Sequence, residues 1–203
     1  MSTSPLEFDS IIIPKVRGSS FLDIGSGYGK WGFLLKKYFW QISGDSVSSP
    51  FVAGLDIFMP HLLSLKTMNI YDLLIKANAP RLPFKDNSFD TVLAIELLEH
   101  TDKENGARLL GELKRVAKLR AIVTTPNFKD FRDGLTGLDG YNPHEKHSSY
   151  WTVSELKKHN FDCLGTGIRF SSSYILNKVL HSLTYKLPRL SRYIIGVHYK
   201  NDR

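Results

Sequence analysis

The sequence predicts an α/β fold built on a mostly parallel sheet. Short apolar runs of strand length alternate with longer segments of helical periodicity, as expected for parallel strands joined by crossover helices. The first apolar run ends in an acid that is followed by three glycines at alternate positions, over residues 23–29. At 203 residues the chain can bury a full core, and we expect one domain over residues 1–203.

Each expected element follows from its own residues. Apolar runs that stop at a polar or turn residue predict strands, which we place at residues 20–24, 51–57, 72–77, 89–95 and 121–125. Helical spacing predicts helices at residues 5–16, 30–41, 60–68, 102–116 and 152–159. Residues 161–168 and 193–199 are expected to form a closing strand pair, and the polar stretch 43–50 a loop.

The composition is that of a globular protein without a transmembrane segment. Hydrophobic residues make up 42% and charged residues 23% of the chain, which is ordinary for a globular protein. No apolar run approaches the roughly 20 residues that span a bilayer, and residues 1–9 lack the pattern of a signal peptide. The single cysteine, Cys163, allows neither an intrachain disulfide nor a multi-cysteine metal site. We therefore expect a cytoplasmic protein without a transmembrane segment.

The turn over residues 23–29 is the most specific motif. A glycine-rich turn between a strand and a helix lets backbone N–H groups approach a polar ligand closely. Its Gly-x-Gly-x-Gly spacing differs from the Gly-x-Gly-x-x-Gly of dinucleotide binders. Asp23, which precedes the glycines, favours a ligand with a positive charge over a pyrophosphate. The segment resembles the first motif of class I S-adenosylmethionine-dependent methyltransferases.

Two later segments resemble the same family in order. Residues 52–57 end in Asp56, which can accept both hydroxyls of a ribose, although alone it fits a helix cap equally well. Residues 78–84, Asn-Ala-Pro-Arg-Leu-Pro-Phe, resemble the Asp-Ala-x-x-Leu-Pro-Phe that lines the adenine site in the family. Asn78 replaces the usual acid and keeps the ability to accept a hydrogen bond from an amine.

A third segment, residues 89–100, resembles the Phe-Asp-x-Val stretch ending in Leu-Glu-His that is common in small-molecule members of the family. In the family the pair corresponding to Glu99 and His100 more often shapes the loop than takes part in catalysis. The strand exit lacks the Asn-Pro-Pro-Tyr of enzymes that methylate the amino group of adenine or of glutamine. Cys163 lies too far along the chain to serve as a nucleophile there.

The resemblance is to small-molecule class I enzymes of the type 11-like group. It implies a Rossmann-like fold with a mostly parallel seven-stranded sheet and helices on both faces. It also implies S-adenosylmethionine as the cofactor. The residues expected to contact this cofactor are Asp23, Gly25, Ser26, Gly27, Tyr28, Gly29, Asp56, Ile57, Asn78, Ala79 and Ile95.

A long segment over residues 126–151 is predicted to be a loop that contacts the methyl acceptor, because loops of this length are usually functional. His144 and His147 are candidate general bases, and exposed histidines without a role are an equally good interpretation of either one. Their His-Glu-x-His spacing differs from the His-Glu-x-x-His of zinc proteases, so no metal site is expected.

Residues 171–190 have apolar residues at helical spacing with basic residues between them. A helix docked on its own domain is the first interpretation, and peripheral contact with an anionic membrane is the second. The net charge of +7 leaves an RNA substrate open, although the basic residues are scattered.

The expected function is methyl transfer to a small-molecule or lipid-like acceptor. The alternatives are an RNA methyltransferase and a non-catalytic module that binds S-adenosylmethionine or a partner.

Overall fold

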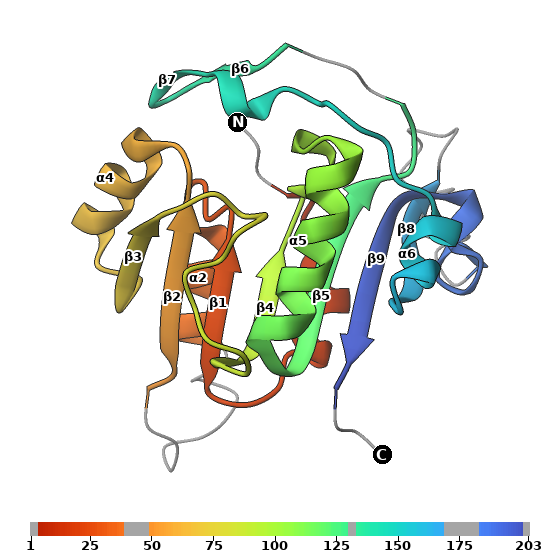
Figure 1. The fold of residues 1–203 in the computed structure, drawn as a ribbon, viewed down its shortest axis with the longest axis horizontal. Helices are drawn as coiled ribbons and strands as arrows, with labels where there is room; N and C mark the ends of the chain where they lie inside the picture. The colour runs from red at the N-terminus through yellow and green to blue at the C-terminus, as the bar shows by residue number, and fades with distance from the viewer. Residues whose placement is uncertain (1–3, 39–48, 130–132, 169–182, 201–203) are drawn as a thin grey trace.

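The computed structural model describes residues 4–38, 49–129, 133–168 and 183–200. Its main sheet has seven strands in the order β3-β2-β1-β4-β5-β9-β8 (Figure 1). The strands are β1 Ser20–Ile24, β2 Phe51–Asp56, β3 Leu73–Lys76, β4 Phe89–Ala94, β5 Ala117–Pro126, β8 Asp162–Ile168 and β9 Ser191–Tyr199. The first five run parallel, and β9 runs antiparallel to both β5 and β8. The predicted mostly parallel, seven-stranded sheet is confirmed.

Helices cover both faces of the sheet (Figure 1). The α-helices are α1 Glu7–Ile12, α2 Lys30–Phe33, α4 Met59–Met68, α5 Lys103–Val116 and α6 Val153–Lys158. Shorter turns are η1 Ile13–Lys15, η2 Leu34–Tyr38, η3 Leu98–His100, η4 Pro143–Glu145 and η5 Pro188–Leu190. Across the described ranges, no helix combines the length and the apolar character needed to cross a membrane.

The core lies in two layers, one on each face of the sheet. In β1 alternate side chains enter opposite layers: Leu22 packs with α5, and Phe21 packs with α1. On α5, Leu109 and Leu113 are four residues apart and fully buried, as one face of an amphipathic helix requires. Phe8 of α1 is fully buried in the opposite layer. This two-sided burial holds the carboxyl ends of the parallel strands at one edge.

Several predicted boundaries differ from the structure. The first helix changes to a 3-10 turn at Pro14, whose missing N–H cannot continue an α-helix. The helix expected over 30–41 is a short α-helix followed by a π-helical turn, and residues 39–48 lie outside the described ranges. The strand expected at 121–125 begins earlier, at Ala117, because it follows α5 without a loop.

Two longer segments also differ from expectation. The predicted loop over 126–151 contains a small antiparallel hairpin, β6 Leu135–Gly137 and β7 Gly140–Asn142. Of the expected insert at 171–190, residues 171–182 lie outside the described ranges. In its described part Thr184 is buried, while Leu183 and Leu187 are about half exposed.

Candidate functional site

A cleft lies at the carboxyl ends of β1, β2 and β4. It has two adjoining hollows with empty volumes of about 730 Å³ and about 680 Å³. Both hollows are lined by Gly25, Asp56, Ile57, Leu97, His100 and His144. In open α/β sheets this edge is where ligands bind, because the strand order reverses there and leaves a crevice.

The glycine turn forms one wall. Gly25, Gly27 and Gly29 have φ values of +72°, +49° and +82°, which side chains rarely adopt. A Cβ added at Gly27 would meet only the Gly25 carbonyl oxygen, at 3.8 Å, so the turn is open on the side of the cleft. A Cβ added at Gly29 would lie 2.5 Å from Leu65 Cδ2, so this glycine serves packing behind the turn.

Asp56 holds the turn in place. Its Oδ2 accepts a hydrogen bond from the Gly27 N–H at 2.9 Å, and its Oδ1 accepts one from the Phe58 N–H at 2.8 Å. The Nδ1 of His61 lies 3.4 Å from Oδ2. Burial lowers the pKa of His61, but the hydrogen bond to Asp56 and its charge outweigh burial and leave that pKa raised. A carboxylate has about four acceptor positions, so Asp56 keeps room for a hydroxyl of a ligand.

Asp23 lies behind the turn instead of on the cleft. It is buried, and its Oδ2 accepts a hydrogen bond from the Tyr71 hydroxyl at 2.6 Å. The pKa of Asp23 is raised to about 7: burial raises it most, the hydrogen bond from Tyr71 lowers it, and the charge of Asp56 raises it. This carboxyl is therefore placed to support the turn from behind.

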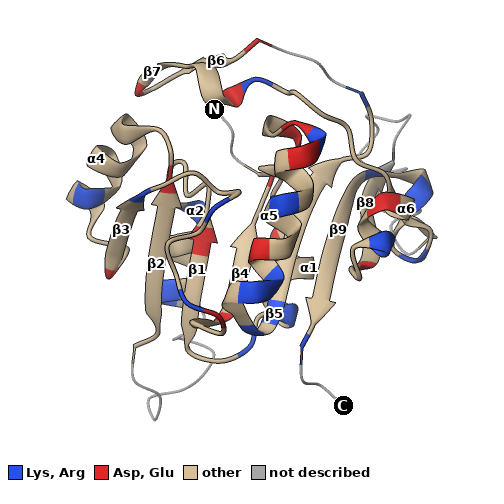
Figure 2. Ribbon diagram, in the orientation of Figure 1, with Lys and Arg blue, Asp and Glu red and all other residues tan. Residues whose placement is uncertain are grey.

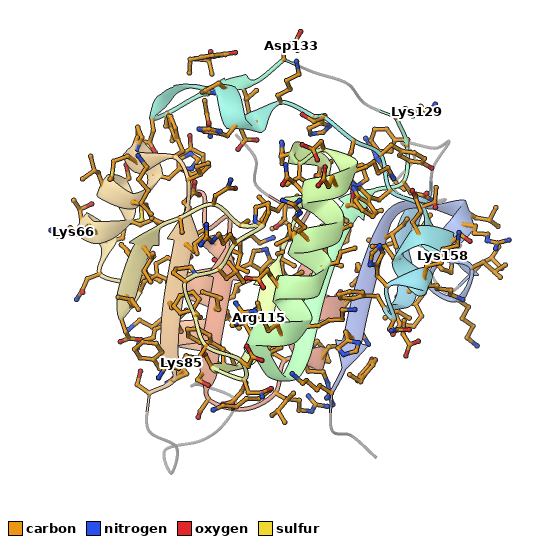
Figure 3. All side chains as sticks on the ribbon, in the orientation of Figure 1. Lys66, Lys85, Arg115, Lys129, Asp133 and Lys158 are labelled. Atoms are coloured by element: carbon orange, nitrogen blue, oxygen red, sulfur yellow. The ribbon has the colours of Figure 1, made fainter. Side chains whose placement is uncertain are left out.

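The segment that lines the second hollow is tied to α5. Asn78 and Ala79 line this hollow. A few residues later, the Leu82 N–H donates to Glu112 Oε2 at 2.8 Å. Arg115 points from α5 toward the same loop, where its Nη1 donates to the Phe84 carbonyl at 2.8 Å (Figure 3). These bonds fix residues 78–84 beside the cleft.

The β6–β7 hairpin lies above the strand ends (Figure 1). The Leu138 N–H donates to the Tyr28 hydroxyl at 2.9 Å, and Ser64 of α4 donates to Asp139 Oδ1 at 2.9 Å. A Cβ added at Gly137 would lie 2.3 Å from the Tyr28 hydroxyl, so only glycine permits this approach. The hairpin is thus anchored to the glycine turn, and residues 142–145 after it line the cleft.

The inner wall is made of acids and histidines. Glu96, at a φ of +52°, donates its N–H to Thr124 Oγ1, and that hydroxyl donates back to Glu96 Oε1, both at 2.8 Å. Burial raises the pKa of Glu99 well above its usual range, and the nearby Glu96 charge adds to this. The rings of His100 and His147 lie edge to face, 4.8 Å apart.

The structure brings most of the predicted site residues to one cleft. The predicted residues that line it are Gly25, Ser26, Gly27, Tyr28, Asp56, Ile57, Asn78, Ala79, Ile95 and His144. Those that lie behind the lining are Asp23, Gly29 and His147. The lining residues that the sequence interpretation did not single out are Ser4, Lys30, Trp31, Leu55, His61, Ala77, Glu96, Leu97 and Thr101. His100 was expected to shape the loop, and Asn142 and Glu145 lie in the predicted acceptor loop. Of the residues not singled out, Glu96 carried a signal, in the pattern Glu-x-x-Glu-His.

Known proteins resemble this chain in sequence and in fold. The family described as a methyltransferase domain matches residues 22–124. An uncharacterized protein of Methanocaldococcus jannaschii is 38% identical over 154 residues, which cover 67% of this chain and 60% of that protein. The chain therefore spans less than two thirds of the length of this relative.

Solved structures share the fold at low identity. PH0226 from Pyrococcus horikoshii matches with a TM-score of 0.62 and 15% identity, over 96% of this chain and 88% of its own. Magnesium protoporphyrin IX methyltransferase from Synechocystis, solved with bound S-adenosylmethionine, matches with a TM-score of 0.55 and 16% identity, over 95% and 76%. A methyltransferase from Archaeoglobus fulgidus that depends on S-adenosylmethionine matches with a TM-score of 0.58 and 20% identity, over 96% and 92%.

The residues present fit the cofactor of this family. The open turn at Gly27 leaves backbone accessible, and Asp56 retains an acceptor position toward the cleft. The match over residues 22–124 covers the glycine turn, Asp56 and the strand exit at β4. This chain belongs to the class I S-adenosylmethionine-dependent methyltransferases, and its cofactor is S-adenosylmethionine.

Proposed function

We propose that this chain transfers a methyl group to a small-molecule or lipid-like acceptor. The observation that carries this proposal is the covered cleft, which has the glycine turn on one side and residues 142–145 on the other. S-adenosylmethionine supplies a methyl group on a sulfonium, which is already a good leaving group.

The residues of the chain then act mainly by positioning. We assign the open glycine turn to the methionine part of the cofactor, Asp56 to its ribose, and Asn78 with Ala79 to its adenine. Holding the reacting groups in line accounts for a large part of the rate, because it replaces a bimolecular encounter by an oriented one. His144 is exposed and lines both hollows, so it is our candidate to take a proton from the acceptor.

The first test is calorimetric titration with S-adenosylmethionine. We expect wild type to bind and Gly27→Val to lose binding, because the new side chain would stand in the cleft. Gly140→Val is the matched control: it is also at a positive φ, +92°, and no other atom lies within 4 Å of its Cβ. Both variants place a side chain at a positive φ, and only the first should lose the cofactor. Wild-type affinity in Gly27→Val would remove the turn from the binding site.

RNA is the second acceptor class, and the net charge of +7 is the observation that favours it. Figure 2 shows Lys and Arg interspersed with Asp and Glu on α5 and α6. Along these two helices the acids interrupt the basic residues, which disfavours a phosphate track there. A rate of methyl transfer to bulk RNA that falls steeply with added salt would place RNA ahead of a small molecule as the acceptor, since phosphate binding releases counterions. Cofactor binding without transfer to any acceptor would favour a non-catalytic module.

Two further expectations remain predictions from the sequence. One is a location in the cytoplasm, and the other is peripheral membrane contact through residues 171–190. Co-sedimentation with vesicles that contain anionic lipid tests the second.

A further inference from the structure

We propose that Glu99, His100 and His147 form a binding site for a divalent transition-metal ion of the zinc type in the inner wall of the cleft. One carboxylate oxygen of Glu99 and one ring nitrogen of each histidine all lie within 4.8 Å of one another. A tetrahedral ion with bonds of about 2.0–2.2 Å keeps its ligand atoms about 3.4 Å apart, so the groups need to draw together by about 1.4 Å at most.

The buried carboxylate is the first argument. Glu99 is 3% exposed, and its Oε2 accepts no hydrogen bond from any described residue. The charged groups that face Glu99 are Glu96 and Glu145, both negative. An ionised acid buried among acids is unfavourable, so the group either takes up a proton or pairs with a cation. A divalent ion between Glu99 and the histidines would supply that charge.

The backbone around the cluster is the second argument. The N–H groups of Ser148 and Ser149 both donate to the Glu99 carbonyl, at 2.8 Å and 3.1 Å. These two bonds hold His147, the residue before them, against η3 even though it is far away along the chain. His147 is only 6% exposed, so its ring is fixed by its surroundings. Backbone hydrogen bonds therefore hold the two segments that carry the three ligand residues next to each other.

The orientation of His100 is the third argument. Its Nδ1 lies 3.2 Å from the Lys146 carbonyl oxygen. A backbone carbonyl can only accept, so this contact assigns a proton to Nδ1 of His100. In the neutral imidazole Nε2 then carries the lone pair, and it lies 3.8 Å from Glu145 Oε2 at the edge of the cluster. A metal-binding histidine is usually oriented in this way, because its other ring N–H donates a hydrogen bond to a backbone carbonyl, a carboxylate or a water.

The ligand types select the ion. Two imidazole nitrogens with one carboxylate oxygen match three-ligand zinc sites, which keep a fourth position open. Mg²⁺ and Ca²⁺ prefer oxygen ligands throughout and should bind more weakly. His100 also lines both hollows, so the open position would face the cleft. An oxygen of the methyl acceptor could occupy this open position, and that role rests on the proposed function. Binding of the ion itself is independent of the proposed function.

The test is calorimetric titration of tag-free, chelator-dialysed protein with ZnCl₂ and, separately, with MgCl₂. We expect one Zn²⁺ per chain and weaker binding of Mg²⁺. Glu99→Gln and His147→Gln should each weaken Zn²⁺ binding by about 100-fold or more, because each removes a direct ligand. His144→Gln is the matched control, three residues away on the same segment and outside the cluster, and should bind Zn²⁺ as wild type does.

Thermal unfolding of each variant shows that it is folded before titration. Absence of stoichiometric Zn²⁺ binding in folded wild type would overturn the proposal. So would unchanged binding in both Glu99→Gln and His147→Gln, because the ion would then lie elsewhere. A parallel titration with S-adenosylmethionine separates the two proposals: Zn²⁺ binding without cofactor binding leaves the metal site standing and removes the proposed function.

Discussion

The buried Asp23 should make this fold less stable at neutral pH than at mildly acidic pH. Its pKa is raised from 3.8 to about 7, chiefly by burial. The folded protein therefore holds this proton more tightly than the unfolded chain does. Linkage then requires the stabilisation to be complete below pH 3.8 and to be lost as the pH rises from there to about 7.

The size of the effect follows from the same shift. A pKa that rises by about three units corresponds to roughly 4 kcal/mol in the free energy of unfolding over the whole window. Between about pH 5 and about pH 8, the part of the window that is easy to measure, roughly 2–3 kcal/mol should be lost. Asp23→Asn removes the titration and keeps the shape of the side chain.

The assay is urea unfolding of both proteins at those two pH values. We expect wild type to lose roughly 2–3 kcal/mol relative to Asp23→Asn between the lower and the higher pH. Any change in the bond to Tyr71 shifts Asp23→Asn equally at both pH values, so the difference isolates the proton. The reasoning is refuted if the wild-type minus variant difference stays within about 0.5 kcal/mol across the range.

Asp90 provides the matched control. It accepts hydrogen bonds from the backbone N–H groups of Ser19 and Ser20 at 2.9 Å and 3.0 Å. Partial burial raises the pKa of Asp90, but these bonds outweigh it and leave the pKa lowered. Its contribution is present above the unfolded pKa and is lost only as the pH falls toward the folded one. Asp90→Asn should therefore differ from wild type by the same amount at both pH values.

Three more predictions concern the cleft and the core. Asp56→Ala removes hydrogen bonds to a charged acceptor, each worth about 1.5–3 kcal/mol. Cofactor affinity measured by calorimetry should therefore fall at least about tenfold, and wild-type affinity in the variant would contradict the role of Asp56. Tyr28→Phe removes the hydroxyl that accepts the hydrogen bond from the Leu138 N–H. Limited proteolysis should then cut the hairpin faster while the melting temperature changes little. An unchanged cleavage rate would mean that this hydrogen bond does not anchor the hairpin. Leu113→Ala should lower the free energy of unfolding by about 2–5 kcal/mol in urea, because its site is fully buried, and a loss below about 1 kcal/mol would contradict that burial.

The sequence predicted the sheet and one wall of the cleft because both depend on local signals. An apolar run such as residues 20–24 forms a strand wherever it is buried, and alternate glycines permit a turn that side chains forbid. Thr152 and Glu155 form the expected capping box for the same reason, since only three residues separate them. Boundaries were less accurate where one element runs directly into the next, as at Ala117.

The inner wall could not be predicted in the same way. His147 is held near Glu99 by two backbone N–H groups after it, which donate to the Glu99 carbonyl. Such bonds leave no periodicity and no spacing in the sequence. For Asp23 the motif was evident in the sequence, but its position behind the turn was not. The Tyr71 hydroxyl that holds it there comes from a different segment.

The bond between Leu138 and Tyr28 makes the glycine turn and the hairpin one thermodynamic unit. Tyr28 follows Gly27 directly in the turn. A ligand that orders the turn therefore also orders the anchor of the hairpin, so the hairpin loses less entropy when it packs over the cleft. Coupling of this kind is reciprocal: whatever factor the cofactor adds to acceptor affinity, the acceptor adds to cofactor affinity. On the proposed function, we expect the cofactor to bind before the acceptor, because the hairpin above the cleft is anchored on the turn that we assign to the cofactor.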